Sequence, residues 1–493
     1  MSIREGITFD DVLLVPKFSS ITSRSETDLS TRLSKNISLN IPLISANMDT
    51  VTESTMAVTM AREGGIGIIH RFLTIEEQAN QVLKVKRSGS VMIENPYQIN
   101  DNQSISTAFE IMNDKEVSGL LVVNSESKLV GILTERDVLF ESPNSDKLVN
   151  ELMTKDVVTS KPNTTVSEAK EILKNNRIEK LPLIDDNRNI HGLFSTQDIL
   201  NTENYPNASK DKKGRPLVGA AVGVKGDFLE RTEALLEANT DVIVVDIAHG
   251  HSENAITTVK NIKKAFPDCE LIAGNVATAQ GTEDLIKAGV DAVKVGVGSG
   301  SICITRVITG SGVPQLTAVM DCAEIAKKYD IPIISDGGTK TSGDATKALA
   351  GGASTVMLGS MLSGTDESPG STISKNGKRY KIYRGMASLA AARGRKSKET
   401  GLVDLADDLN DYVAEGVEGF VPYKGTVTDI IKQITGGIRS GLSYCGGHTI
   451  SQMQENAEFI KMSGAGFAES KPHDVDLMWL VFYCFRIQFF YVK

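Results

Sequence analysis

Short, uninterrupted apolar runs recur along the chain, and each is followed by a stretch whose spacing is compatible with a helix. Runs without polar alternation are typical of strands that are buried on both faces of a parallel sheet. Eight such strands alternating with helices favour a closed (β/α)8 barrel, and an open, doubly wound α/β sheet is the alternative. The predicted strands span residues 41–45, 65–69, 217–221, 242–246, 270–274, 291–296, 331–335 and 354–358.

The regular spacing breaks once, because a long insert separates the second run from the third. Within it, residues 131–137 (Gly-Ile-Leu-Thr-Glu-Arg-Asp) reappear as residues 192–198 (Gly-Leu-Phe-Ser-Thr-Gln-Asp), a shift of 61 positions. Residues 117–123 reappear at the same shift as residues 178–184. A repeat of this length indicates a duplicated supersecondary unit inserted into the barrel.

Composition narrows the choice of partners. With 493 residues, 40% of them hydrophobic and 23% charged, the chain suits a globular protein of about two or three domains. A net charge of -9 argues against nucleic acid or an anionic membrane as the main partner, but it leaves small anionic ligands possible.

The cysteines and the first residues indicate the compartment. Cys269, Cys303, Cys322, Cys445 and Cys484 form no CxxC pair and no disulfide framework. The start of the chain lacks the apolar core of a signal peptide. We therefore expect a reducing, cytoplasmic location and no membrane attachment.

The segment leading into Cys303 carries the strongest chemical signal. Gly296, Gly298 and Gly300 precede the thiol, and hydroxyl groups and Arg306 flank it. Glycine lets backbone amides approach a ligand closely because no Cβ intervenes. The pattern favours covalent chemistry on a phosphorylated substrate, and the alternative is a cysteine that acts only as a small buried apolar residue.

Activating this thiol needs help. Moving a thiol pKa from about 8.5 to below 7 requires roughly 1.5 units, or about 2 kcal/mol. A helix N-terminus supplies only about 0.3–1 kcal/mol at an exposed position. Arg306 or a bound ligand is therefore expected to contribute.

In a (β/α)8 barrel the active site lies at the C-terminal ends of the strands. The loops after the last three strands can hold one phosphate, which places Asp336 for ribose hydroxyls and Cys303 for the base. Two histidines at positions i and i+2 without a third ligand are poor evidence for zinc. The pattern describes a purine nucleoside monophosphate across the barrel mouth. The strand-end candidates are Asn47, Met48, Asp49, Asp246, His249, Gly250, His251, Asn275, Ser301, Cys303, Asp336, Gly337, Gly338, Gly359 and Ser360.

In the insert, a hydroxyl residue stands three positions before an aspartate in both copies: Thr134 with Asp137, and Ser195 with Asp198. A helix N-cap explains either hydroxyl alone, but not the repetition of the whole pattern in register. Each copy resembles a cystathionine-β-synthase-type (CBS) motif. The tandem pair implies a regulatory module that binds purine nucleotides.

Outside the insert, several long motifs resemble the IMP dehydrogenase / GMP reductase family. The resemblance implies a catalytic barrel in two parts, 1–91 and 204–475, with a mobile flap at about 387–424. The CBS pair forms the insert, 92–203 (92–148 and 149–203), and an aromatic tail of unassigned role follows at 476–493. The matching motifs lie at residues 8–14, 47–53, 246–252, 300–305, 335–338, 383–388 and 471–475.

The resemblance implies a two-stage reaction in guanine nucleotide synthesis. The Cys303 thiolate attacks C2 of inosine 5′-monophosphate (IMP), and hydride passes to NAD to leave a covalent thioimidate. After the flap moves in, water hydrolyses the intermediate to xanthosine 5′-monophosphate, with Thr305 near the reacting carbon. The implied substrate contacts are Met48, Ser301, Asp336, Gly338, Gly359, Ser360, Tyr383, Gly385, Met386, Ala387 and Glu415, and the implied NAD contacts are Asp246, His249, Asn275, Gly296 and Gly298.

A potassium ion is also implied. Its ligands would be backbone carbonyls of Gly298, Gly300 and Cys303, completed by the segment Glu469, Ser470 and Lys471 of a neighbouring subunit. This shared site implies a homotetramer or an octamer.

The flap departs from the family pattern, in which an Arg-Tyr pair precedes the Glu415 region and the arginine activates water. Residues 391–411 contain no such pair. Arg393 and Arg395 are the basic candidates for that role, and a solvated basic loop is the alternative.

Two other functions remain open. GMP reductase shares the barrel, the cysteine and the phosphate loops; against it stand His249-Gly250-His251, where the reductase pattern has Asn-Gly-Tyr, and Arg384 in the motif at 383–386. A catalytically weak nucleotide sensor would rely on the CBS pair, and the intact Cys303 and Thr305 argue against it.

Overall fold

The computed structural model describes residues 3–89, 92–115, 117–400, 413–472 and 474. The chain divides into two compact units. The first comprises residues 1–86, 207–211 and 216–493, and the second comprises residues 87–206 and 212–215.

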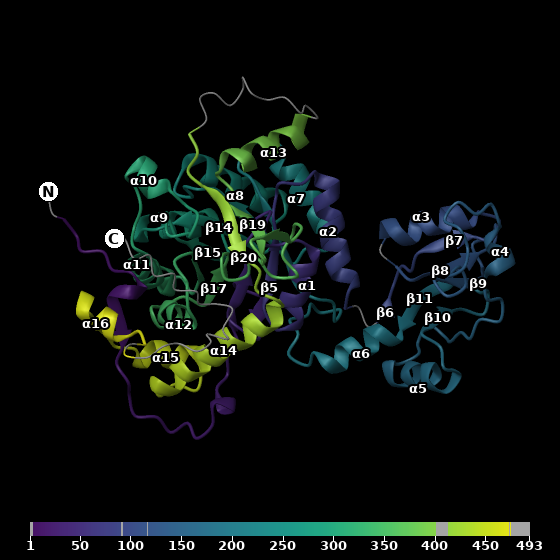
Figure 1. Ribbon diagram of the computed structural model, residues 1–493, viewed down its shortest axis with the longest axis horizontal. Coiled ribbons are helices and arrows are strands. Elements are labelled where there is room, and N and C mark those ends of the chain that lie inside the picture. Colours follow the sequence, from purple (N-terminus) through teal and green to yellow (C-terminus); the bar gives the residue numbers. More distant parts are fainter. Residues whose placement is uncertain (1–2, 90–91, 116, 401–412, 473, 475–493) are drawn as a thin grey trace. The chain divides into compact units, whose positions relative to one another are not determined.

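The first unit is built on a closed barrel of eight parallel strands (Figure 1), which confirms the predicted (β/α)8 fold. The predicted apolar runs all correspond to barrel strands, with ends that differ by at most two residues. In barrel order the strands are β12 (Val218–Val222), β13 (Val242–Asp246), β14 (Leu271–Val276), β15 (Ala292–Val295), β16 (Ile333–Asp336), β17 (Thr355–Leu358), β4 (Leu43–Ser45) and β5 (Ile66–Ile69).

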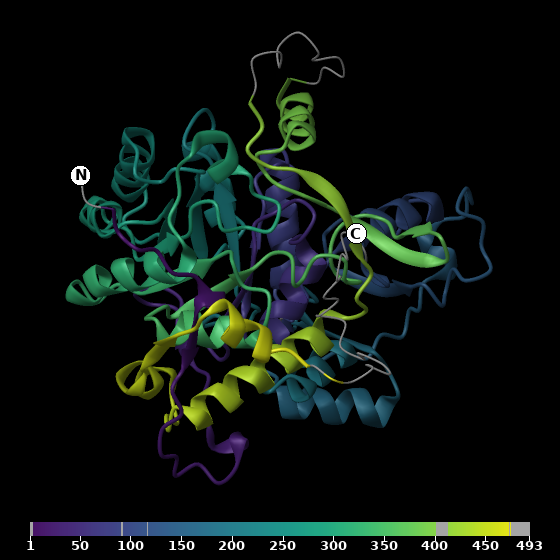
Figure 2. The same ribbon diagram turned by 60° about the vertical axis from the view of Figure 1, so that its left-hand side comes forward.

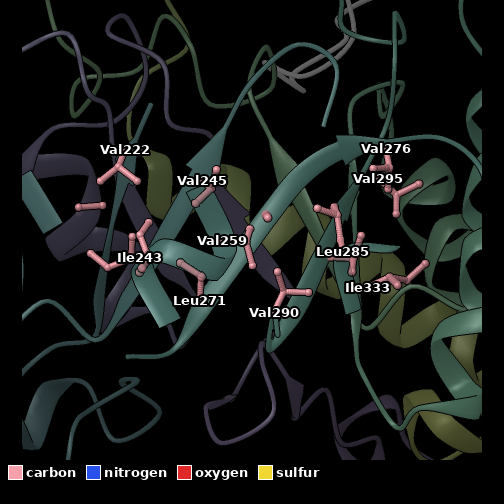
Figure 3. Packing of buried hydrophobic residues seen from close by; sticks show 14 of the residues in the cluster. Val222, Ile243, Val245, Val259, Leu271, Val276, Leu285, Val290, Val295 and Ile333 are labelled. Atoms are coloured by element: carbon pink, nitrogen blue, oxygen red, sulfur yellow. The ribbon is translucent and has the colours of Figure 1, made fainter. Parts of the chain in front are cut away.

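Helices cover the barrel from outside. Val242 and Val244 of β13 belong to the cluster that fills the barrel. The alternate residues Ile243 and Val245 pack outward with helix residues such as Val259 (Figure 3). Burial of both faces explains why the strand sequences are apolar throughout. The surrounding helices are α1 (Ser54–Arg62), α2 (Ile75–Arg87), α7 (Phe228–Glu237), α8 (Glu253–Ala265), α9 (Ala279–Ala288), α11 (Gln315–Lys328), α12 (Ser342–Ala350) and α14 (Val427–Tyr444).

A three-stranded antiparallel sheet extends from the barrel between β17 and α14, seen in bright green in Figure 2. It consists of β18 (Ile373–Lys375), β19 (Lys378–Arg384) and β20 (Glu418–Pro422). Helix α13 (Leu389–Thr400) follows β19. Of the predicted flap at 387–424, residues 401–412 lie outside the described part of the chain.

Several small elements, most of them near the ends of the chain, complete the barrel unit. Strand β1 (Val12–Leu14) pairs with β21 (Phe459–Lys461), so the N-terminal and C-terminal regions lie side by side. The other small elements are η1 (Phe9–Asp11), η2 (Arg24–Glu26), β2 (Thr31–Arg32), β3 (Ser38–Leu39), α10 (Thr305–Thr309), α15 (Ile450–Asn456) and α16 (Gly464–Glu469). Among the described residues, no helix is long and apolar enough to cross a membrane.

The second unit contains the sequence repeat. Helix α3 (Ile105–Lys115) and strands β8 (Gly119–Val123) and β9 (Leu129–Thr134) recur 61 positions later as α5 (Val166–Asn176), β10 (Lys180–Ile184) and β11 (Ile190–Ser195). Each copy forms a three-stranded sheet, β7-β8-β9 and β10-β11-β6. The remaining elements of this unit are β6 (Met92–Ile93), β7 (Gln98–Asn100), α4 (Val149–Leu152) and α6 (Thr196–Asn204).

Candidate active site

The loops that leave β15, β16 and β17 meet at the C-terminal end of the barrel. Gly296, directly after β15, has φ +151, and a Cβ there would lie 2.0 Å from the carbonyl oxygen of Asp336. Only glycine lets the two loops come this close. A Cβ at Gly337 would lie 2.5 Å from Ser299 Oγ, so the β16 loop also touches the segment before Cys303.

Backbone hydrogen bonds fix the Cys303 loop. The Cys303 amide donates to the carbonyl of Gly300 at 3.1 Å. On its other side, the loop forms an antiparallel bridge to Gly416, and the Ile304 amide donates to the Glu415 carbonyl at 2.8 Å. Residues 415 and 416, within the predicted flap, thus hold the cysteine loop, and Cys303 is partly exposed.

The side chains of Cys303, Thr305 and Glu415 form a chain of contacts. Cys303 Sγ lies 3.2 Å from Thr305 Oγ1, and Thr305 Oγ1 donates to Glu415 Oε2 at 2.7 Å. The sequence separates Thr305 from Glu415 by 110 positions, so sequence alone did not link them. A carboxylate that accepts from this hydroxyl can take a proton through it.

Arg306 contacts the backbone of the loop that carries Cys303. Its guanidinium donates to the carbonyls of Val297 and Val313 and so braces the loop backbone. Cys269 and Cys322 are buried, and burial raises the pKa of both thiols to about 12, which keeps them protonated at neutral pH.

The predicted phosphate contacts converge around Tyr383. Ser301 Oγ donates to the Tyr383 hydroxyl at 3.4 Å, and that hydroxyl lies 3.8 Å from Met48 Sδ. A Cβ at Gly359 would lie 3.0 Å from the same oxygen. Burial raises the pKa of Tyr383 to about 12, so its hydroxyl remains a hydrogen-bond donor. Ser360 follows Gly359 in the β17 loop.

Strand β19 leads into the segment predicted to contact the base. The Gly385 amide donates to the Val417 carbonyl at 2.9 Å, and the Ala387 carbonyl accepts from the Glu415 amide at 3.1 Å. Met386 lies between them and is half-buried. These bonds join the 385–387 segment to the 415–417 segment that also holds the Cys303 loop.

A second polar cluster links the predicted ribose and NAD residues. Lys294 Nζ lies 3.0 Å from Asp246 Oδ1 and 2.8 Å from Asp336 Oδ2, and it also donates to Asn275 Oδ1. Asn275 Nδ2 donates to Asp336 Oδ2 at 2.9 Å and to the Gly296 carbonyl at 2.8 Å. Lys294 was not among the residues predicted from the sequence. A lysine within an apolar strand is nevertheless a signal of function, because lysine is rarely buried without a partner.

Opposite charges in this cluster shift the pKa values of Asp246 and Lys294 towards their charged forms. Burial raises the pKa of Asp246, but the nearby charges of Lys294 and Arg71 outweigh it, and the net pKa is lowered. Burial lowers the pKa of Lys294, and the Asp336 and Asp246 carboxylates reverse this to a net increase. Asp246 and Lys294 are therefore charged at neutral pH.

His249 and Gly298 are the two other residues predicted to contact NAD. The ring of His249 is 6.4 Å from that of His251, which contacts Asp284 Oδ2 at 2.9 Å. Among the described residues, no group of three potential metal ligands occurs. Gly298, with φ +74, lies between Gly296 and Gly300.

Lys424, which was not predicted from the sequence, stabilises the loop after β17. Lys424 Nζ donates to the carbonyl of Ser360 and, at 3.3 Å, to that of Met361. These bonds connect the β17 loop to the chain after β20.

The remaining predicted residues are distributed as follows. Arg393 is exposed on α13 and is not part of the Cys303–Thr305–Glu415 chain. Ser470 Oγ donates to the Gly466 carbonyl at 2.9 Å, and Lys471 lies over the Phe467 ring, both next to Glu469 at the end of α16. The side chains of Arg395 and Asp198 and the tail 476–493 lie outside the described residues.

In the insert, the Asp137 carboxylate accepts hydrogen bonds from nearby Thr134. Its Oδ2 accepts from both the amide and the hydroxyl of Thr134, each at 2.7 Å. Ser195 ends β11 at the equivalent position of the second copy. Thr134 is the donor in both bonds, and residues 135–140 form turns, so no helix begins there for Thr134 to cap. The other oxygen of Asp137 lies 3.4 Å from Thr154 Oγ1.

Comparison with known proteins gives one consistent family. A model of the IMP dehydrogenase / GMP reductase domain matches residues 6–473. An inosine-5′-monophosphate dehydrogenase from Nitrosopumilus maritimus is 76% identical over 478 residues, which cover 97% of this chain and 100% of that protein. The enzyme of the same name from Aquifex aeolicus is 52% identical over 96% of each chain.

Solved structures agree in fold over nearly the whole chain. A cysteine-to-alanine variant of GMP reductase from Trypanosoma brucei, in complex with guanosine 5′-monophosphate, has a TM-score of 0.89 and 45% identity, covering 96% of this chain and 99% of that one. The same reductase in complex with guanosine 5′-triphosphate has a TM-score of 0.79 and 41% identity. The chain belongs to the IMP dehydrogenase / GMP reductase family.

Proposed function

We propose that the chain oxidises IMP to xanthosine 5′-monophosphate with NAD as the electron acceptor, in guanine nucleotide synthesis. The observation that carries the proposal is the partly exposed Cys303, 3.2 Å from Thr305, in a loop bridged to Gly416 of the predicted flap. Relatives that are 76% and 52% identical over almost their whole length are named inosine-5′-monophosphate dehydrogenase, which supports it.

Substrate would be held from its phosphate end. Ser301, Gly338, Gly359, Ser360 and Tyr383 offer amides and hydroxyls to the phosphate. The Asp336 carboxylate accepts from the ribose hydroxyls, and Met48, Met386 and neighbouring backbone groups contact the base. This placement brings C2 of the purine to the Cys303 sulfur, an arrangement that replaces a bimolecular encounter with a positioned one.

The first chemical stage forms a bond to sulfur. The Cys303 thiolate adds to C2 of IMP, and the C2 hydrogen then leaves with its electron pair. When bound, NAD supplies the acceptor for that hydrogen. A thioimidate remains on Cys303.

The second stage releases the product. Water attacks C2, and one of its protons passes through the Thr305 hydroxyl to the Glu415 carboxylate, 2.7 Å away. The second proton of the water moves to the ring nitrogen beside C2, the water oxygen becomes the new carbonyl oxygen, and Cys303 leaves as a thiolate. We propose the Thr305–Glu415 pair for this role because Arg393 is exposed on α13. Arg395 remains an alternative.

The residues present fit NAD and K⁺, the two groups that the family resemblance implies. Asp246, at the end of β13, has a lowered pKa and a side chain 19% exposed, so it can accept hydrogen bonds from NAD ribose hydroxyls. Asn275, His249 and Gly298 are the other candidate contacts to NAD. Carbonyls of Gly298, Gly300 and Cys303 are the donor type that K⁺ takes. K⁺ would fix the loop's shape, with the Glu469–Lys471 segment of a neighbouring subunit completing its shell in a homotetramer or octamer.

The insert is proposed as a regulatory CBS pair. Its recurring helix and two strands support a duplicated nucleotide-binding module, with Thr134, Asp137, Ser195 and Asp198 as candidate contacts to purine nucleotides. We place the enzyme in the cytoplasm, with the tail 476–493 outside the catalytic unit.

GMP reductase is the second candidate. The Trypanosoma brucei reductase matches 96% of this chain, and residues 391–411 lack the Arg-Tyr pair. The His249-Gly250-His251 motif and Arg384 favour the dehydrogenase. The Arg384 guanidinium pairs with Asp49 at 2.7 Å, which joins β19 to the loop that carries Met48.

One assay separates these functions. The protein is incubated with IMP and NAD, and separately with guanosine 5′-monophosphate and NADPH, while absorbance of the reduced cofactor is followed. Growth only in the first mixture supports the dehydrogenase, and decay only in the second assigns the reductase. No change in either, with a purine nucleotide still binding, assigns a sensor.

A further inference from the structure

Lys294 is a buried charge at the centre of the barrel mouth that the proposed mechanism does not use. Only 3% of its side chain is exposed, and its neighbours Val293 and Val295 pack outward among the helix-facing residues. Because strand residues alternate, Lys294 faces the barrel interior. A buried lysine retains its charge only where partners compensate for the loss of water.

Its partners come from three other strands. The ammonium group has three hydrogens, and it contacts Asp246 at the end of β13, Asn275 of β14 and Asp336 at the end of β16. The two carboxylates lie within 3.0 Å of the same nitrogen. Without that ammonium, two like charges would face each other in a poorly hydrated site and would move apart or take up a proton.

Each carboxylate keeps part of its surface open. The exposed fractions are 19% for Asp246 and 22% for Asp336, so each can accept hydroxyl groups from a ligand while it is held by the lysine. We propose that Lys294 is a positioning residue that fixes the cofactor-side carboxylate of Asp246 and the ribose carboxylate of Asp336 together, so that one side chain sets the binding of both IMP and NAD. This inference rests on the proposed function.

A matched control exists at the opposite end of the same barrel. Lys86 is equally buried and also lies between two carboxylates, Asp241 at 2.6 Å and Asp211 at 3.1 Å. Asp241 precedes β13, whereas Asp246 ends it, so the Lys86 pair is remote from the strand ends that form the site. Replacement of either lysine removes the same kind of buried ion pair.

The experiment compares Lys294→Met, Lys294→Arg and Lys86→Met in the full-length protein. KM for IMP, KM for NAD and kcat are measured, together with the melting temperature and the Kd of IMP without NAD. Lys294→Met is expected to raise both KM values and the IMP Kd by about tenfold, with a smaller change in kcat. Lys294→Arg should reverse most of the increase in both KM values and in the IMP Kd. Lys86→Met should lower the melting temperature while leaving both KM values within about twofold of the wild-type values.

The outcomes are distinct. If wild-type protein oxidises IMP but Lys294→Met changes neither KM, or changes only one, the inference is wrong and the proposed function stands. The inference also fails if Lys86→Met raises both KM values as much. If wild-type protein does not oxidise IMP, the proposed function is wrong and the inference falls with it. Should Lys294→Met not fold, Lys294→Gln takes its place with the same expected result, because a neutral amide does not balance two carboxylates.

Discussion

At the scale of single residues, Cys303 differs from the other described cysteines in exposure. Cys303→Ala is expected to abolish turnover while leaving IMP binding within about tenfold, because phosphate and ribose contacts lie elsewhere. The matched control is Cys269→Ala, which should keep its activity because burial raises the pKa of that thiol to about 12. Steady-state kinetics and equilibrium binding of IMP check both. Measurable IMP oxidation by the Cys303 variant would remove the covalent mechanism.

The Thr305–Glu415 hydrogen bond gives the second residue-scale prediction. Glu415→Gln removes the proton acceptor for water, so kcat should fall by about 10²-fold while the first turnover stays fast. Stopped-flow measurement should then show a burst of reduced cofactor followed by a slow steady state. The exposed Glu418→Gln on β20 is the control. A first turnover slowed as much as the steady state would assign Glu415 a role before hydrolysis.

Residue identity was easier to predict than residue partnership. Cys303, Asp336 and Tyr383 stood in long motifs, and the structure brings their loops together. The lysines were missed because their partners lie far away in sequence: Lys294 contacts Asp336 from 42 positions away, and Lys424 contacts Ser360 from 64. No local pattern encodes such contacts.

At the scale of elements, α14 packs against α12 through glycines, and both views show α14 along the outside of the barrel (Figures 1 and 2). A Cβ at Gly441 would lie 2.3 Å from Thr346 Cγ2 of α12, whereas a Cβ at Gly436, in the same helix, would meet nothing within 4 Å. The two positions therefore respond oppositely to the same change.

Gly441→Ala should destabilise the protein by about 1–3 kcal/mol, because the helices must separate to admit the methyl group. Gly436→Ala should stabilise it by about 0.4–1 kcal/mol, because alanine restricts the unfolded chain. Denaturant unfolding followed by circular dichroism checks both. Equal shifts in the same direction would contradict the close packing of α12 and α14.

The barrel strands were predictable because burial on both faces leaves a continuous apolar run. The sheet β18–β20 gave no such run: β19 has the sequence Lys-Arg-Tyr-Lys-Ile-Tyr-Arg, and most of β20 is exposed. Charged residues on open sheet faces do not distinguish a strand from a loop. The sequence therefore indicated a flap without its supporting sheet.

At the scale of the whole molecule, all eight barrel strands and the contacts around Cys303 come from one unit. Replacing residues 92–203 with a short linker should therefore leave kcat for IMP oxidation within about threefold of the full chain. Any effect of adenine or guanine nucleotides on the rate should disappear. Loss of activity from a folded, truncated protein would show that the insert takes part in catalysis.

The central claim is that Cys303 forms a covalent bond to the purine during IMP oxidation. The most direct measurement is acid quenching of the protein during turnover with IMP and NAD, followed by mass spectrometry of its peptides. We expect an adduct on the Cys303 peptide with the mass of IMP less two hydrogen atoms, and more of it in the Glu415→Gln variant. Xanthosine 5′-monophosphate formed without any Cys303 adduct, or an adduct on another residue, would contradict it.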